Sequence, residues 1–400
     1  MLKTRENIYL GLLCLLLLTL VTSYYATIPI VLLVVFFFTD KKAIVKNKIV
    51  IAFKSPITSM LVVYFLIHLI GYLCAIESKF ALKEMTQRLS YLILPMIIFG
   101  ESVSYNNLSK LLRLFTILVI TVLSLLVCYH YVFYQKSISS FVYFGYKTLA
   151  ISPFYYSVFI FIAMKISIAF KPKFWQVELF VLFLFLFLLG NRTSILFVLI
   201  YMMCLFFKEV KLSAFKKVGV LFLLLLFGGV TIGISGAVRQ KTNILFKTIS
   251  FDIETIQTKN SITHTRNTLE HRILIWHLAK DIITENPMFG VGVANYKTEL
   301  YNKYKEVNFK AAIKNRFNTH NQYIEEVLKF GVIWGGVFVC FVVLFVKQTL
   351  NYKNGFPVVL LVALLSFFES FWYRHHGVLI ISFMIPLLCV YDKKTRRQLI

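Results

Sequence analysis

A few arginine residues lie where an apolar sequence rarely carries a positive charge, and they are the first candidates for chemistry. Arg192 lies between two long apolar runs, in FLLGNRTSILF. A cation near membrane depth is costly, so such a residue is a candidate for a functional role by default. Arg272 and Trp276 are spaced to share one face of a helix, and Arg266 lies just before that stretch. Because guanidinium groups present a rigid fork of donors suited to phosphate, these residues indicate an anion site. A snorkelling or capping role for Arg192, and a solvated helix charge for Arg272, are the alternatives.

Three further ionisable residues lie beside apolar segments. His320 directly precedes an apolar run, where it could act as a general base near neutral pH or serve as an interfacial aromatic side chain. Glu369 lies in the apolar sequence LLSFFESFWYRHH, close to Arg374, so it is expected within a span, as an internal ion-pair partner or as support for a catalytic His or Arg residue. Arg88, at the start of another apolar segment, is a further candidate cation of the same pocket.

The composition indicates which kind of protein must position these residues. Of the 400 residues, 58% are hydrophobic and 15% are charged, the mean hydropathy is +0.76 and the formal net charge is +25. A soluble domain averages about 45–50% apolar and about 25% charged residues, so an ordinary soluble enzyme, a disordered chain and a disulfide-stapled secreted domain are excluded. On a membrane protein a basic excess follows topology, which argues against a nucleic-acid partner. The six cysteines lie in or beside apolar segments without zinc-ligand spacing, and we interpret them as small core side chains.

Apolar segments long enough to cross a bilayer recur along the chain. The sequence therefore predicts an all-α integral membrane protein with about 12 transmembrane helices and one long, partly helical outer loop between the ninth and the tenth. The segments cover residues 8–24, 26–39, 58–76, 86–100, 111–134, 151–170, 174–190, 193–207, 217–237, 324–346, 356–373 and 377–391. In the tenth segment, the spacing of Gly331 and Gly335 predicts that a neighbouring helix approaches closely.

The basic residues fix the predicted orientation. The loops assigned to the inside, with both ends of the chain, carry about 21 Lys and Arg residues, and the short outer loops carry about seven. The positive-inside rule then places both termini in the cytoplasm and the long loop outside. We expect three parts: helices 1–9 (residues 1–237), the loop with an amphipathic helix (238–321), and helices 10–12 with a cytoplasmic tail (322–400).

The long loop contains one strongly patterned segment. Residues 269–285 have apolar side chains at helical spacing and predict an amphipathic helix that lies against the membrane domain or along its interface. Asn267 or Thr268 can cap its start, Asn286-Pro287 ends it, and residues 287–292 predict a tight turn. The helix is either a lid or structural strap, or its polar face carries a site.

At these motifs the chain resembles the bacterial O-antigen ligase and O-antigen polymerase superfamily. The order and spacing of several short motifs carry the resemblance, which covers roughly residues 185–335, whereas the N-terminal half is similar only in hydropathy. One departure is Trp334, where the family often has a small residue or Tyr. The motifs are Leu188–Ser194 around the membrane-embedded Arg, Arg272–Ala279, Asn286–Gly292, and Thr319–Tyr323 with Gly331 downstream.

The resemblance implies a GT-C-like membrane glycosyltransferase of the bacterial inner membrane. Its donor would be a glycan on undecaprenyl pyrophosphate, moved en bloc at the periplasmic face to lipid A–core, with inversion and without a metal ion or other cofactor. Arg192 and Arg272 would bind and neutralise the pyrophosphate leaving group, and His320 would be the base for the acceptor hydroxyl. Glu369 matches an acidic position in the family's penultimate span less securely. From their positions in this sequence, Arg266, Asn321 and Arg88 are expected to bind substrate with Glu369.

Other functions use a similar framework. A polymerase that joins repeat units, or a protein O-oligosaccharyltransferase, would need the same cations for the same donor. A transporter or flippase often shows internal repeats, which this sequence lacks, and the patterned outer loop argues against one. A structural scaffold would need neither Arg192 nor His320 near the membrane. The sequence therefore favours a ligase of the O-antigen type.

Overall fold

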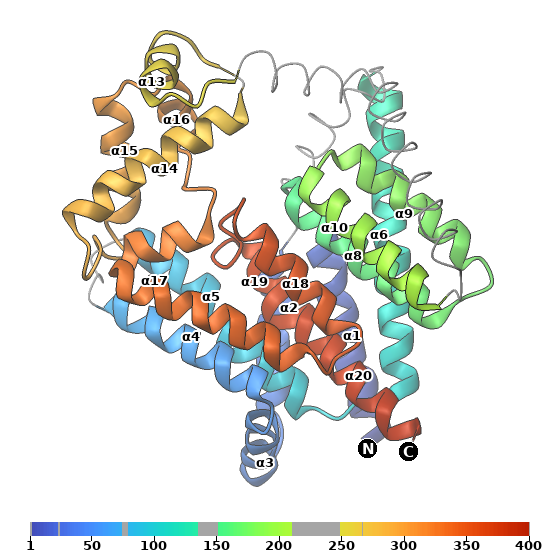
Figure 1. Cartoon of the computed structure of the whole chain (residues 1–400). Helices are drawn as coiled ribbons and strands as arrows, with labels where there is room; N and C mark the ends of the chain where they lie inside the picture. The colour runs from blue at the N-terminus through green and yellow to red at the C-terminus, as the bar shows by residue number, and fades with distance from the viewer. Residues whose placement is uncertain are drawn as a thin grey trace. The chain divides into compact units, whose positions relative to one another are not determined.

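The fold was analysed in a computed structural model, which describes residues 2–22, 25–73, 79–134, 151–209, 249–265 and 267–399. All regular elements within these ranges are helical (Figure 1). The chain divides into two compact units, one formed by Met1–Leu118 with Ser250–Ile400 and the other by Val119–Ile249. The three-part division expected from the sequence stays a prediction.

The first unit combines the two ends of the sequence. It begins with α1 (Leu2–Thr22), α2 (Thr27–Phe38), α3 (Lys42–Phe53), α4 (Pro56–Leu73), α5 (Lys79–Gly100) and the start of α6 (Tyr105–Tyr134). It continues with α13 (Ile253–Ile262), α14 (Thr268–Glu285), α15 (Tyr296–Glu306), α16 (Lys310–Asn315), α17 (Gln322–Thr349), α18 (Gly355–Leu365), α19 (His375–Leu379), the π-helix η2 (Ile380–Met384) and α20 (Ile385–Leu399). The second unit holds the rest of α6 with α8 (Pro153–Phe170), α9 (Trp175–Leu189) and α10 (Arg192–Glu209).

Several of these helices are suited to a bilayer. Six are long and apolar enough to cross it: Thr4–Thr22, Pro56–Leu73, Tyr105–Val132, Pro153–Phe170, Gln322–Thr349 and His375–Arg396. Three shorter apolar helices cover Thr27–Phe38, Trp175–Leu189 and Gly355–Leu365. The regular elements of the described residues are therefore all helical, and their apolar lengths fit a membrane protein. The number of twelve spans stays a prediction, since the segment expected at 217–237 lies outside the described residues.

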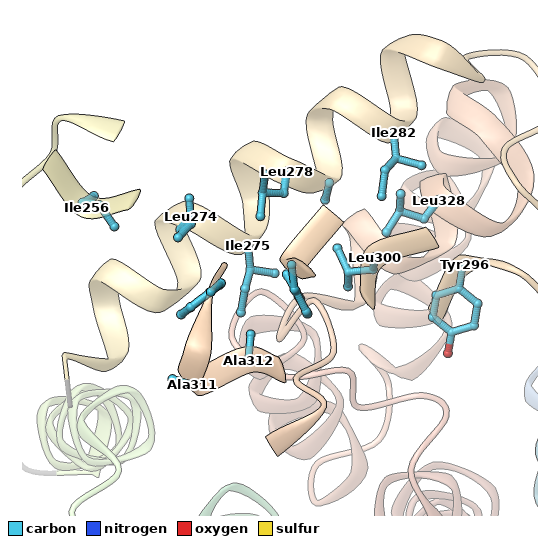
Figure 2. Packing of buried hydrophobic residues seen from close by; sticks show 13 residues of the cluster. Ile256, Leu274, Ile275, Leu278, Ile282, Tyr296, Leu300, Ala311, Ala312 and Leu328 are labelled. Carbon is cyan, nitrogen blue, oxygen red and sulfur yellow. The ribbon is translucent and has the colours of Figure 1, made fainter. Parts of the chain in front are cut away.

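Four helices, α13 to α16, follow one another between residues 253 and 315 and share a hydrophobic core (Figure 2). Leu274, Ile275, Leu278 and Ile282 project from one face of α14 into this core, and Leu328 of α17 joins them. Burying each such side chain contributes about 1.5–3 kcal/mol, so the amphipathic pattern attaches α14 to the first part of α17. Ile273, Trp276 and Ile283, on a neighbouring face of the helix, pack at the edge of this core and are only partly buried.

Local sequence signals determine both ends of α14. The Asn267 side chain accepts hydrogen bonds from the backbone N–H groups of Leu269 and Glu270, at 3.2 and 3.4 Å. The helix ends at Glu285, and Asn286 is its C-cap before Pro287. The predicted helix, its cap and its end are therefore confirmed, because each depends on residues close in sequence.

The tight turn after α14 packs against a kink in α17. Gly331 interrupts α17 with a φ of 84°, and the backbone of Val332 donates to the Pro287 carbonyl group at 2.8 Å. A Cβ atom on Gly331 would lie 2.1 Å from the Met288 carbonyl oxygen. The glycine therefore admits the turn rather than a neighbouring helix, and a Cβ on Gly335 would meet Val327 of its own helix. The expected helix–helix contact was wrong for this reason.

The close packing at this kink predicts a specific loss of stability. In Gly331→Ala, the side chain would occupy a left-handed conformation, which costs roughly 1–3 kcal/mol, and would also clash with Met288. We expect a lower unfolding temperature for the detergent-purified protein. Gly336→Ala is the matched control, because its Cβ would meet nothing within 4 Å. Equal unfolding temperatures for both variants would contradict the packing described.

Candidate functional site

A short non-helical turn between α18 and α19, residues 366–374, gathers several of the predicted site residues. Arg272 reaches it from α14, and its Nη2 atom donates to the Phe368 carbonyl oxygen at 3.1 Å. The guanidinium carbon lies 5.9 Å from the centre of the Phe368 ring. The Arg272 side chain is half-buried beside the Glu369 carboxylate. Burial lowers the pKa of Arg272, and the nearby Glu369 opposes this shift. A partly desolvated Arg of this kind can bind an anionic group strongly.

Glu369 lies in this turn and faces His320. Its Oε2 atom is 3.5 Å from the Nδ1 atom of His320, and its Oε1 atom is 3.4 Å from the Nε atom of Arg374. Burial alone would raise the pKa of the Glu369 carboxyl group, but His320 and two neighbouring arginines lower it to about 2. The carboxylate is therefore ionised at neutral pH. The position predicted within a span was wrong, because α18 ends at Leu365 and the chain turns before α19.

His320 is held in an uncommon backbone conformation. Its φ is 47°, in the left-handed region that non-glycine residues rarely adopt. The Trp276 indole N–H donates to the carbonyl oxygen of Thr319 at 2.9 Å, and the Asn318 side chain accepts from the His320 N–H at 3.3 Å. The His320 side chain is 24% exposed, and its Nδ1 atom has no hydrogen-bond partner among the described residues. The imidazole is thus backed by a carboxylate and accessible from outside.

Asn321 has a structural role in the fold. It is the N-cap of α17, and its side-chain oxygen accepts from the backbone N–H groups of Tyr323 and Ile324 at 2.9 and 3.2 Å. This oxygen satisfies donors that a helix start would otherwise leave unpaired. The predicted contact between Asn321 and substrate stays a prediction.

Arg88 belongs to a different group of contacts within the first unit. It is fully buried, and its Nη1 atom donates to the Tyr64 hydroxyl group at 2.8 Å. Its Nε and Nη2 atoms have no hydrogen-bond partner among the described residues. The Tyr64 hydroxyl in turn donates to Glu326 at 3.1 Å. No direct contact joins Arg88 to the His320 group in the described ranges, and its role in substrate binding stays a prediction.

The structure does not test whether the other two predicted cations belong to this group. Arg192 is an exposed residue at the start of α10, in the second unit, beside a buried set in which Asn191 donates to Ser157 at 3.2 Å. Arg266 lies outside the described residues. The structure therefore brings together Arg272, His320 and Glu369, and the assignments of Arg192 and Arg266 remain predictions.

The structure also places a buried charge cluster that the sequence reasoning did not assign to the site. Lys329 contacts Glu325 at 2.6 Å and Glu84 at 3.7 Å, and its ammonium group lies 4.4 Å from the ring centre of Tyr296. The i,i+4 spacing of Glu325 and Lys329 was a signal for the first pair. Lys297 forms a further ion pair with Glu84. Within the described ranges, no three His, Cys, Asp or Glu residues gather closely enough to hold a metal ion.

The comparisons with known proteins agree with one another, because each names a ligase. A family model described as O-antigen ligase matches residues 178–340. A "Putative polysaccharide ligase" of Rickettsia felis is 28% identical over 115 residues, and one of Rickettsia conorii is 26% identical over 114 residues. Each match covers 28% of this chain and 28% of the relative's own length.

The matched region contains the residues that carried the resemblance. Residues 178–340 include Arg192, Arg272 and His320, and the last two lie together at the turn between α18 and α19. The apolar helices fit a multi-pass membrane protein. The resemblance seen in the sequence is thereby confirmed: residues 178–340 are similar to the O-antigen ligase family.

Proposed function

We propose that this protein is a glycosyltransferase of the O-antigen ligase type. It moves a glycan en bloc from undecaprenyl pyrophosphate to lipid A–core, at the periplasmic face of a bacterial inner membrane, with both termini in the cytoplasm. The observation that carries the proposal is the grouping of Arg272, His320 and the ionised Glu369 at one turn. The similarity of residues 178–340 to the O-antigen ligase family supports a role of the ligase or polymerase type.

The donor side of the reaction needs a cation. As the bond from the anomeric carbon to the pyrophosphate oxygen breaks, negative charge accumulates on the leaving group. Arg272 is proposed to neutralise that charge, because a preorganised guanidinium group in a site with little water stabilises a developing anion directly. The family resemblance, rather than a contact, assigns Arg192 to the same pyrophosphate. Arg266, Arg88 and Asn321 are proposed to bind substrate because of their positions in the sequence.

The acceptor side needs a base. With the Nδ1 atom of His320 facing the Glu369 carboxylate, the Nε2 atom is left to take the proton of the acceptor hydroxyl. The acceptor oxygen then bonds to the anomeric carbon from the side opposite the pyrophosphate, so the configuration inverts. Glu369 orients the imidazole and stabilises the imidazolium ion that forms, as a carboxylate does for histidine in other transferases and hydrolases.

The choice between ligase and polymerase is tested by removing the gene and examining the lipopolysaccharide on gels. We expect long glycan to accumulate on the polyprenyl carrier while the core stays bare, since a ligase acts after chain growth. Core that carries a single repeat unit would instead identify a polymerase. Unchanged lipopolysaccharide together with an underglycosylated protein would identify a protein O-oligosaccharyltransferase.

Two substitutions test the assigned roles. His320→Ala and Arg272→Ala should each abolish transfer in a complemented deletion strain while leaving expression and membrane insertion intact, because they remove the base and the donor cation. His264→Ala and Lys280→Ala are the matched controls. Both side chains are exposed, and both residues lie in the same folded region as Arg272. Normal long-chain lipopolysaccharide in either site variant would refute the roles.

A third expectation concerns metal ions. If arginine supplies the charge on the donor side, transfer by the purified protein in vesicles should survive chelation by EDTA. The control is a metal-dependent glycosyltransferase assayed in the same buffer, which EDTA should inactivate. Loss of transfer that Mg²⁺ or Mn²⁺ restores would count against the arginine-based mechanism.

A further inference from the structure

Gln322, in the first turn of α17, joins two parts of the first unit through three hydrogen bonds. Its backbone N–H donates to the carbonyl oxygen of Ser366 at 2.8 Å. Its side-chain oxygen accepts from the backbone N–H of Trp372 at 2.9 Å, and its side-chain nitrogen donates to Glu326 at 2.7 Å. The residue is fully buried. Gln322 therefore contacts both ends of the turn that carries Glu369.

Glu326 determines which way the Gln322 amide points. Three other buried or partly buried groups also donate to this carboxylate: the His68 ring at 3.0 Å, the Trp334 indole at 3.0 Å and the Tyr64 hydroxyl at 3.1 Å. A carboxylate only accepts, and the Trp372 N–H only donates, so the Gln322 amide has a single orientation that satisfies both. Trp334, where the sequence departs from its family, is one of these donors.

Trp372 is fixed by hydrogen bonds and by ring contacts. Its carbonyl oxygen accepts from the Tyr91 hydroxyl at 2.7 Å, and its indole N–H donates to the Ser366 side chain at 3.2 Å. Its ring packs edge-on against Tyr64 and Phe338, and the side chain is 1% exposed. Because Trp372 lies three residues after Glu369, fixing its backbone also fixes where the Glu369 carboxylate points.

We propose that Gln322 is a positioning residue of the transfer reaction, and that Glu326 orients its amide. Gln322 bonds Trp372 and Ser366 to the first turn of α17. Because His320 lies two residues before Gln322, these bonds hold the Glu369 carboxylate opposite the His320 imidazole. The inference rests on the proposed function. It assigns no contact with substrate to Gln322.

The geometry of the His320 pair explains why such positioning matters. The Glu369 oxygen is 3.5 Å from the His320 Nδ1 atom, longer than an ordinary hydrogen bond. A displacement of about 1 Å in a catalytic geometry can cost about a hundredfold in rate. A small movement of residues 366–374 would therefore separate the carboxylate from the imidazole.

An exchange of the two side chains tests the proposal. Gln322→Glu places two carboxylates against each other and leaves no donor between them, so we expect long-chain lipopolysaccharide to fall about a hundredfold at matched protein level. In the double variant Gln322→Glu, Glu326→Gln, the new carboxylate accepts from both Trp372 and the new amide. Transfer should then recover to within about tenfold of the unmodified protein. Gln348→Glu, exposed on the same helix, is the matched control and should transfer normally.

A second measurement separates positioning from general loss of folding. Amide hydrogen exchange of residues 366–374 in the purified full chain should speed up in Gln322→Glu and in the similarly sized Gln322→Met, and slow again in the double variant. Exchange of residues 274–282 should not change. Unaltered exchange of 366–374 in both single variants, or a double variant no more active than Gln322→Glu, would overturn the proposal. If the unmodified protein itself transfers no glycan, the proposed function fails, whereas the exchange data still test whether Gln322 fixes the turn.

Discussion

The pairing of backbone groups in the turn between α18 and α19 is the constraint on which the site depends. A non-helical turn buried among helices leaves N–H and C=O groups without partners, and each unpaired group is costly away from water. Here Arg272 donates a hydrogen bond to the Phe368 carbonyl, and Tyr91 donates one to the Trp372 carbonyl. The side-chain oxygen of Gln322 accepts from the Trp372 N–H. The same bonds that stabilise the turn therefore bring a cation and a carboxylate to it.

Electrostatics at the turn follows from this arrangement. Glu369 is buried, and burial alone would raise the pKa of its carboxyl group, but His320, Arg374 and Arg272 lower that pKa to about 2. The carboxylate in turn offsets part of the cost of burying the Arg272 charge. The proposed diphosphate donor would meet a cation whose ordinary hydration has already been partly removed. Preorganisation of this kind makes a charged site more effective than the same residues in water.

Features of the fold and the site could be predicted from the sequence where they depend on neighbouring residues, but not where they depend on residues far apart in the chain. Helix α14, its Asn267 cap and its end at Asn286 followed from neighbouring residues. The position of Glu369 did not, because an apolar run gives no sign that a helix stops at Leu365. The contact between His68 and Glu326 joins residues that lie 258 positions apart, and no local pattern reports it. His320 and Arg272 were singled out by their residue types, but only the family resemblance suggested that they act together.

The central claim is that Arg272 binds the donor diphosphate at the turn, while His320 faces the anomeric carbon from the opposite side. A cryo-EM structure of the protein with a non-hydrolysable undecaprenyl diphosphate analogue in lipid nanodiscs tests it most directly. The account predicts the diphosphate within hydrogen-bond distance of the Arg272 guanidinium group, with the anomeric position open toward His320. A diphosphate bound away from residues 366–374 and out of reach of the Arg272 guanidinium group would contradict it.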